Sequence, residues 1–223
     1  MLNLSNIALV LVDGVDPLAS LKTLLHCMKL ATFKEILFFT FQDIEVSEKI
    51  KFVKIKKLDY VEYNDFIISK LNNYVNSDFC LIVQTDGFIL NPEKWQENFL
   101  NFDYVGAPWE RPLQQDYPFG TRVGNGGFSL RSKKFLETTS KKITDYQHMK
   151  DYGLNKNEDF FLCKTNYEKL VSLGIKFADL KTASEFSLES SIPEYPKNFN
   201  DTFGFHGKNP TTLEIIKKIQ NDN

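Results

Sequence analysis

The segment 79–90, FCLIVQTDGFIL, constrains the fold more than any other part of the sequence. An apolar run stops at the polar residues Gln84-Thr85-Asp86, and a second apolar run follows Gly87. A short continuous apolar run bounded by turn residues is typical of a strand buried on both faces in a sheet covered by helices. Asp86 is then expected at the carboxyl end of this strand, where ligands bind in open α/β sheets. An Asp-Gly pair is also a common tight turn between two strands, and both interpretations stay open.

The order of the expected elements favours a layered α/β domain. Apolar runs predict strands at 7–12, 35–41, 52–55 and 79–83, and helical spacing predicts helices at 18–31 and 63–75. Strands that alternate with helices in this way indicate a largely parallel sheet. The second half predicts a short helix at 92–99, a strand ending at 131, helices at 133–143, 157–174 and 211–219, and irregular segments at 109–122 and 182–205.

Charge excludes some functions. The formal net charge of -2 and the isoelectric point near 6.0 give no basic footprint, so nucleic acid is not an expected partner. Lysines recur at positions 49, 51, 54, 56 and 57. They fit the solvated face of an edge strand, and peripheral attraction to a membrane surface is the alternative.

Cysteine usage and the N-terminus indicate a cytoplasmic protein. Cys27, Cys80 and Cys163 lie far apart in apolar surroundings and show no CxxC spacing. Reduced, buried thiols are therefore expected in place of disulfides or a structural zinc site. The first residues lack a basic leader and reach Asp13 too soon for a signal peptide or a membrane span.

Asp86 is the first candidate ligand. Magnesium and manganese prefer oxygen ligands, and they commonly take one or two protein carboxylates while substrate phosphates and water fill the other positions. A carboxylate at the end of a strand can therefore hold a metal ion on a nucleoside diphosphate.

The glycine-rich run Gly124-Asn125-Gly126-Gly127 precedes a predicted strand. Glycine lets a backbone approach a ligand closely or adopt positive φ, so a phosphate cradle is one interpretation. The run lacks the Lys-Ser/Thr of a P-loop and the GxGxxG order of a dinucleotide fold. A bulge or tight turn in the wall of a site fits better, with Asn125 available to bond a sugar hydroxyl.

Two further features supply candidate side chains. Glu158 and Asp159 open a predicted helix, where acids interact favourably with the helix dipole. The same pair can place one carboxylate in a cleft to accept a proton while its neighbour orients a hydroxyl. His206 stands between aromatic and glycine residues. A lone histidine is usually structural, but an imidazole is also a common metal ligand and would complement Asp86.

Six motifs in order resemble a family of bacterial and viral domains related to GT-A-type glycosyltransferases. They are QTDGF, DYVGAPW, VGNGGFSLRS, NEDFFLC, FSLE and FGFHG. The resemblance spans about residues 78–207 and rests on their combination. It implies a single α/β domain over 1–223 with a Rossmann-like, mixed, mostly parallel sheet flanked by helices. About 1–90 would bind the nucleotide sugar, and about 91–223 would bind the acceptor and carry catalysis.

The resemblance also implies roles for individual residues. Asp86 would be the last residue of a degenerate DxD motif and His206 the C-terminal ligand of Mn²⁺ or Mg²⁺. Asp159 would be the base, and Glu158 would orient the acceptor. Residues expected to bind donor or acceptor are Asp13, Gln84, Thr85, Trp109, Asn125, Gly126 and Gly127. Gln84 departs from a full DxD motif and leaves one carboxylate there.

We therefore expect a metal-dependent, inverting glycosyltransferase of the cytoplasm, with contact to the inner face of a membrane left open. It would move a sugar from a nucleoside diphosphate donor to a hydroxyl of a glycan or glycolipid in surface polysaccharide synthesis. Trp109 would stack on a sugar face, or it is simply a buried aromatic residue.

Two other functions remain. A non-catalytic nucleotide-sugar or glycan-binding module would explain the degenerate Gln84-Thr85-Asp86. A phosphatase with an aspartate nucleophile would use a DxDGT motif, which Asp13-Gly14 and Asp86-Gly87 each resemble in part. The spacing of 12–16 is wrong for that motif, and Gln84 replaces the nucleophile.

Overall fold

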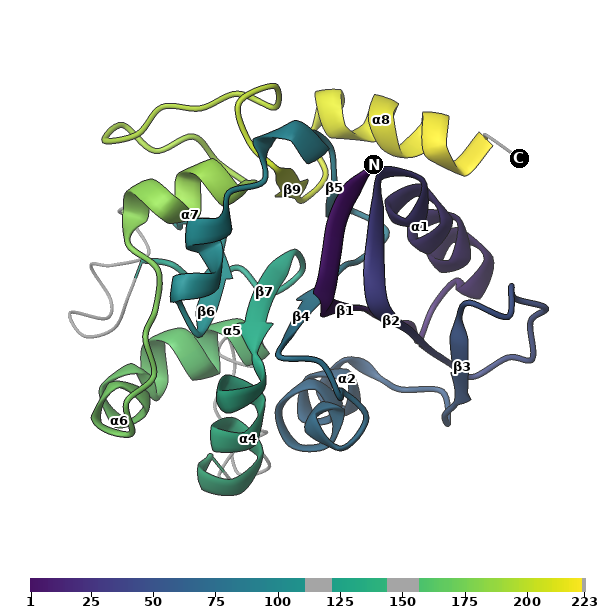
Figure 1. Ribbon diagram of the computed structural model, residues 1–223, viewed down its shortest axis with the longest axis horizontal. Coiled ribbons are helices and arrows are strands. Elements are labelled where there is room, and N and C mark those ends of the chain that lie inside the picture. The colour runs from purple at the N-terminus through teal and green to yellow at the C-terminus, as the bar shows by residue number, and fades with distance from the viewer. Residues whose placement is uncertain (111–121, 144–156, 222–223) are drawn as a thin grey trace.

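The computed structural model describes residues 1–110, 122–143 and 157–221. The first half alternates strands and helices, as the sequence predicts (Figure 1). Its regular elements are β1 (Leu2–Val12), α1 (Pro17–Leu30), β2 (Ala31–Thr40), β3 (Lys51–Lys54), α2 (Tyr60–Asp65), β4 (Phe79–Ile82) and β5 (Gly87–Ile89). Those that follow are β6 (Tyr104–Gly106), β7 (Ser129–Ser132), α4 (Lys133–Lys142), α5 (Glu158–Phe160), α6 (Tyr167–Ser172), α7 (Leu180–Phe186), β8 (Ser187–Leu188), β9 (Gly204–His206) and α8 (Pro210–Asn221).

The central sheet has six strands in the order β3-β2-β1-β4-β7-β6. β1 pairs in parallel with both β2 and β4, and β2 pairs in parallel with β3. β7 runs antiparallel to β4 and to β6, so the sheet is mixed and mostly parallel, which confirms the expected fold class. Because β7 is antiparallel, the start of β7 lies beside the end of β4, where Ile82 pairs with Ser129.

Helices cover both faces of this sheet. Successive residues of β1 point to different cores: Leu9 packs in the cluster that contains Leu24 of α1, and Val10 in the cluster that contains Phe66 beyond α2. Figure 1 shows the same layers, with α1 and α8 on one side of the strands and α2 and α4 on the other. Strands buried on both faces read as continuous apolar runs, which is why β1 and β4 were recognisable from the sequence.

The helix predicted at 63–75 begins earlier and is less regular. α2 starts at Tyr60 because Asp59 and Glu62 form a capping box, in which each side chain bonds the other residue's backbone N–H. A π-helical turn, Phe66–Lys70, and a 3-10 turn, Leu71–Asn73, continue the same segment. A second π-helical turn, Phe161–Thr165, interrupts the helix predicted at 157–174. Such turns are frequent at functional sites.

Two expected caps have different partners. Asn157 occupies the N-cap position of α5 but accepts a hydrogen bond from the Tyr60 hydroxyl at 2.6 Å. Asn91 precedes a single 3-10 turn, Pro92–Lys94, and its amide donates to the carbonyl oxygens of Phe199 and Thr202 at 2.7 and 2.8 Å. Both side chains therefore join distant segments. A further 3-10 turn, Glu97–Asn101, completes the region predicted as one short helix.

The prediction that 182–205 is irregular is correct for 189–203 and wrong at both ends. Asp179 caps the start of α7, because its carboxylate accepts from the Thr182 N–H, and β8 and β9 join β5 in a second, three-stranded sheet. β6 was missed as well. These strands have two or three residues each, too few to produce an alternating pattern that a sequence can show.

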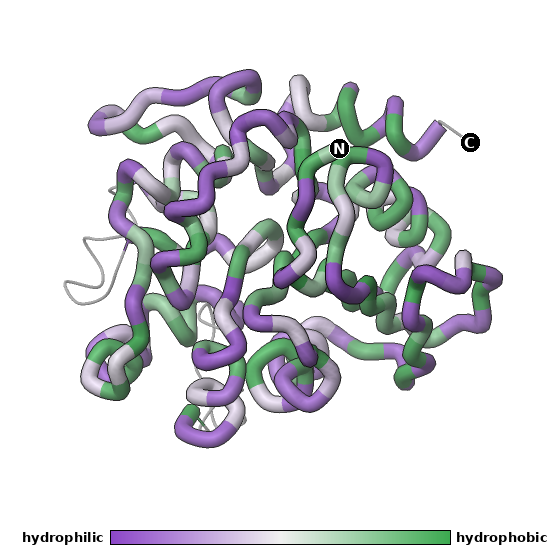
Figure 2. Tube along the Cα trace, in the orientation of Figure 1, coloured by the Kyte–Doolittle hydropathy of each residue, from purple (hydrophilic) through white to green (hydrophobic). Residues whose placement is uncertain are grey.

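Two other expectations are confirmed, the exposed edge strand and the buried free thiols. β3 lies at the edge of the central sheet with Lys51 and Lys54 exposed. All three cysteines are free and buried. Among the described helices, none combines the length and apolarity needed to cross a membrane. Figure 2 shows hydrophobic and hydrophilic stretches alternating along α8, as in an amphipathic helix that packs by one face.

Candidate active site

Asp86 lies in a tight turn at the carboxyl edge of the sheet. Gln84 and Gly87 exchange backbone hydrogen bonds of 2.8 and 3.0 Å, with Thr85 and Asp86 between them. The tight-turn interpretation is therefore confirmed, and the turn that links β4 to β5 also places Asp86 at the end of β4. Thr85 is half-buried at the tip of the turn.

The structure brings Asp86 and His206 together. β5 pairs with β9 so that Gly87 lies opposite His206, and His206 Nε2 is 3.8 Å from Asp86 Oδ1. The Lys208 ammonium lies 3.8 Å from Asp86 Oδ2 and is largely exposed. One carboxylate thus has an imidazole and an ammonium beside it, an arrangement suited to a negatively charged ligand.

Besides Asp86, three side chains surround the His206 ring. Nδ1 lies 3.0 Å from Asn125 Nδ2 and 3.4 Å from Glu189 Oε1, and Nε2 lies 3.3 Å from Gln84 Oε1. Burial alone lowers the pKa of His206, but the Glu189 hydrogen bond and the nearby carboxylates outweigh it and raise that pKa. The Gln84 amide also donates to the Tyr63 hydroxyl at 2.7 Å.

The pair suits part of a metal site. Asp86 offers an oxygen and His206 a nitrogen, and Mn²⁺ accepts both kinds of donor. Within residues 1–110, 122–143 and 157–221, no group of three or more His, Cys, Asp or Glu side chains has the geometry of a complete metal site. A metal ion here would therefore take its remaining ligands from a substrate and water, as magnesium and manganese do on phosphates.

The run Gly124–Gly127 forms a wall between three side chains. A Cβ atom at Gly124 would lie 2.2 Å from the Trp109 ring, and one at Gly127 would lie 2.1 Å from His206 Nε2. A Cβ at Gly126 would lie 2.1 Å from Glu158 Oε1. None of these glycines has positive φ, so close approach is the reason for their presence. The run 124–127 is irregular chain that leads into β7, and its part in the wall of a site stays a prediction.

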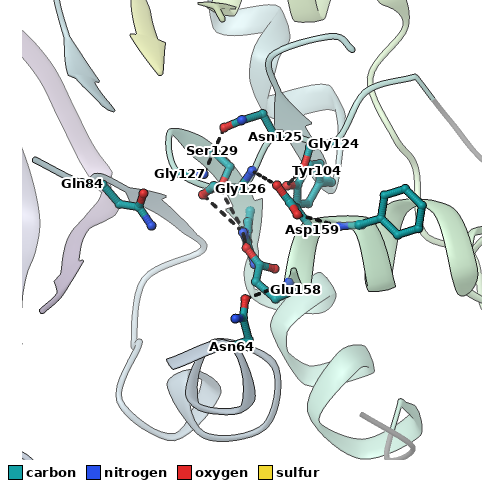
Figure 3. A network of polar contacts seen from close by, with 12 residues as sticks. Asn64, Gln84, Tyr104, Gly124, Asn125, Gly126, Gly127, Ser129, Glu158 and Asp159 are labelled. Carbon is teal, nitrogen blue, oxygen red and sulfur yellow. Dashed lines mark hydrogen bonds and ion pairs between the residues drawn. The ribbon is translucent and has the colours of Figure 1, made fainter. Parts of the chain in front are cut away.

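Glu158 forms a buried ion pair with Arg131. Arg131 Nη1 and Nη2 donate to Glu158 Oε2 and Oε1 at 2.9 and 2.6 Å, and the two residues are 1% and 5% exposed. The Glu158 backbone N–H donates to Asn64 Oδ1 at 2.8 Å, which ties the start of α5 to α2 (Figure 3). Both carboxylate oxygens of Glu158 are therefore engaged within the protein, which leaves little capacity for direct contact with an acceptor.

Asp159 stands beside this pair with a different environment. The backbone N–H groups of Gly126 and Phe160 donate to its carboxylate at 2.9 and 2.6 Å (Figure 3). Burial and then the charge of Glu158 raise the pKa of Asp159 to about 7. A carboxylate with this pKa is matched to proton transfer near neutral pH. Two adjacent acids thus have different chemistry because one is neutralised by an arginine and the other is not.

Two predicted binding residues are held within the protein. Asp13 lies at the carboxyl end of β1, and its carboxylate accepts from the N–H groups of Val15 and Asp16 at 3.2 and 3.0 Å. Trp109 is 8% exposed and packs against Gly124 and Phe160. The structure therefore favours the buried-aromatic interpretation of Trp109 and gives Asp13 a role in the β1–α1 loop.

Sequence reasoning missed several residues of this site, which are Tyr63, Asn64, Arg131, Glu189 and Lys208. Arg131 carried a usable signal, because an arginine in a short apolar strand must find an anion when it is buried. The others have no local signal. Asn64 reaches Glu158 across 94 positions, and Gln84 reaches His206 across 122.

Comparison with known proteins adds the family. Residues 28–206 match the family described as protein of unknown function, DUF5672. The chain is a DUF5672 protein. No curated protein matches its sequence.

Solved structures share the fold of this DUF5672 chain. The galactosyltransferase LgtC, in complex with donor and acceptor sugar analogs, aligns over 98% of this chain and 95% of its own with a TM-score of 0.55 and 12% identity. An active-site mutant of LgtC aligns over 97% and 94% with a TM-score of 0.56 and 13% identity. At this identity the likeness establishes the GT-A-type fold and leaves the activity to be argued from the site.

Proposed function

We propose that this DUF5672 protein is a glycosyltransferase that uses a nucleoside diphosphate sugar and transfers the sugar to a hydroxyl group. The observation that carries the proposal is the short path from Asp86 and His206 to Asp159 across the run Gly124–Gly127. Gly127 packs on His206, and the Gly126 N–H bonds Asp159. A site for a diphosphate and a base with a pKa of about 7 thus share one wall.

In this proposal Asp86 and His206 hold Mn²⁺ or Mg²⁺, and Lys208 adds positive charge beside them. An ion bound there would supply positive charge to stabilise the departing diphosphate. Asp159 takes the proton of the acceptor hydroxyl as its oxygen bonds the anomeric carbon and the bond to the diphosphate breaks. Direct displacement with one base inverts the anomeric configuration.

Glu158 has an indirect part in place of the acceptor contact expected from the sequence. Its charge is the second largest cause, after burial, of the raised pKa of Asp159. Its pairing with Arg131 fixes the start of α5. Gln84 and Asn125 hold the His206 ring, and Thr85 is half-buried at the tip of the turn. In this proposal neither Asp13 nor Trp109 contacts a substrate. Cytoplasmic location and a surface-polysaccharide acceptor remain parts of the proposal.

The non-catalytic binding module is the second candidate, because only one carboxylate, Asp86, stands at the turn. Slow release of nucleoside diphosphate from a donor in the presence of metal would exclude it. The phosphatase alternative is weakened, because the Asp13 carboxylate is bonded to its own loop.

Donor binding is expected to depend on Asp86. A thermal-shift screen against UDP-, GDP-, dTDP- and CMP-sugars should raise the melting temperature with one nucleotide only when manganese is present. Asp86→Ala should lose most of that shift, because it removes the oxygen ligand. Asp43→Ala is the matched control, since Asp43 is an exposed carboxylate paired with Lys54. A metal-dependent shift that Asp86→Ala retains in full would remove Asp86 from the site.

The pH profile is expected to follow Asp159. Because only the deprotonated carboxylate can act as a base, kcat/KM should rise with pH, reach half its maximum near pH 7 and then level off. Initial rates at constant ionic strength across the neutral range would measure this. A half-maximum near the ordinary aspartate value of about 4 would show that the base does not have the raised pKa assigned to Asp159.

A further inference from the structure

Two buried cations lie beside Trp109, outside the site described above. Lys164, in the π-helical turn Phe161–Thr165, is 4% exposed, and its ammonium lies 5.6 Å from the centre of the Trp109 ring. Arg122 is 9% exposed, and its Nε donates to the Trp109 carbonyl oxygen at 3.3 Å. Lysine and arginine are rarely buried to this extent unless an anion accompanies them.

The described parts of the chain supply too few anionic partners for these two cations. Glu194 Oε1 pairs with Arg122 Nη1 at 2.9 Å. Arg122 Nη2 is buried without a hydrogen-bond partner. Across the described parts of the chain, no carboxylate forms an ion pair with Lys164, whose ammonium meets the Trp109 ring instead. Burial and the charge of Arg122 both lower the pKa of Lys164. A buried positive charge and an unused N–H donor therefore remain, which is unfavourable unless a ligand completes them.

The position of these cations follows from the run Gly124–Gly127. Gly127 contacts His206, the Gly126 N–H bonds Asp159, and Gly124 contacts Trp109. Three residues of chain span at most about 10 Å. The proposed base thus lies between the Asp86 and His206 pair at one end of the run and the cations beside Trp109 at the other.

We propose that Arg122 and Lys164 bind an anionic group, a carboxylate or a phosphate, carried by the acceptor. This inference rests on the proposed function, because the donor diphosphate occupies the Asp86 end and Asp159 must contact the acceptor. An anion on the Trp109 side of Asp159 then belongs to the acceptor. The guanidinium offers its unused Nη2 donor, and the ammonium provides a point charge. The acceptor class is therefore an acidic or phosphorylated glycan.

Three monosaccharides test this inference on the full chain. Glucose 6-phosphate, glucuronate and neutral glucose are compared in a thermal-shift assay, with KCl holding the ionic strength equal. At roughly ten times its dissociation constant, one anionic sugar should raise the melting temperature by about 3–5 °C, and glucose should not. The phosphate and carboxylate arms identify which anion is preferred.

Lys164→Met is the decisive variant, with Lys169→Met as its control. Methionine fills a similar volume and removes an uncompensated buried charge, so the ligand-free variant should melt at or above the parent temperature. It should lose the shift with the anionic sugar. Lys169 is exposed on α6, in the same helical region, so the same exchange there should keep the shift in full.

Two results would overturn the inference: no anionic sugar stabilises the parent, or Lys164→Met is stabilised as much as the parent. The second result would also be obtained if the phosphate group bound beside Lys208 and not beside Lys164. The manganese-dependent donor shift is measured on the same preparation. A donor shift without an anion shift contradicts this inference alone. An anion shift without any donor shift contradicts the proposed function and, with it, the assignment of the anion to an acceptor.

Discussion

Arg131→Met is expected to lower the free energy of unfolding by about 3–5 kcal/mol, because it leaves Glu158 as a buried carboxylate without a partner. Native domains of this kind have about 5–15 kcal/mol in total, so the loss is large. Chemical denaturation followed by circular dichroism would measure it. Lys141→Met is the control: Lys141 pairs with Glu137 on the exposed face of α4 at 3.7 Å, and losing such a pair changes stability by about 0.5 kcal/mol or less.

The double variant Arg131→Met with Glu158→Leu tests the reason for that loss. If the uncompensated charge is responsible, replacing both partners with apolar residues should return most of the stability. If the double variant is as unstable as Arg131→Met, then the other contacts of Arg131 carry the effect. Among these are the bonds from its Nε to the Ser129 hydroxyl at 3.0 Å and from its Nη2 to the Gly126 carbonyl oxygen at 3.5 Å, and its guanidinium lies 5.1 Å from the Tyr104 ring.

Asp159→Asn is expected to lower the rate of transfer by about 10²–10⁴-fold while leaving manganese-dependent donor binding intact. The amide keeps the size of the side chain and an oxygen that accepts from the Gly126 N–H, but it cannot take a proton from a hydroxyl. Transfer assays and the donor thermal shift would be compared on the same preparation. Activity equal to that of the parent would remove Asp159 from the mechanism.

Asp159→Asn should also be more stable than the parent protein at alkaline pH. The folded-state pKa of Asp159, about 7, lies above its unfolded value, so the folded protein binds more protons between about pH 4 and pH 7 and loses stability as pH rises through that range. Asp159→Asn has no such loss. At pH 8 we expect the variant to be about 2 kcal/mol more stable than the parent. This is half the free energy that corresponds to the full pKa shift, because water screens the partly exposed carboxylate. Near pH 4 the two proteins should be equally stable. Asp43→Asn, on the surface, should show neither effect.

Most of the first half could be predicted from the sequence because its signals are local. α1 was expected at 18–31 and spans Pro17–Leu30, and the run 79–83 is β4 with one residue beyond it. Long apolar runs and helical periodicity are visible whatever the tertiary arrangement. A strand buried on both faces needs the apolar run, and a helix that packs by one face needs the periodicity. The edge position of β3 followed from its lysines.

The site could be predicted only in part. Asp86, Asp159, His206 and the glycine run were singled out because turn residues at strand ends and acids at helix starts are visible in a sequence. Their partners were not. Arg131 neutralises Glu158, and Glu189 raises the pKa of His206, through contacts between segments that are distant in the chain. The buried cations Arg122 and Lys164 gave no signal in sequence at all.

The sequence by itself determined the α/β class, the order of the main elements and the residue types that can carry the chemistry. Only the tertiary structure decided which of those residues meet. Pairing of β5 with β9 places His206 beside Asp86, and burial next to Glu158 gives Asp159 a raised pKa suited to proton transfer. The physical reason is that secondary structure follows local periodicity, whereas charge and pKa depend on burial and on neighbours that the fold brings close.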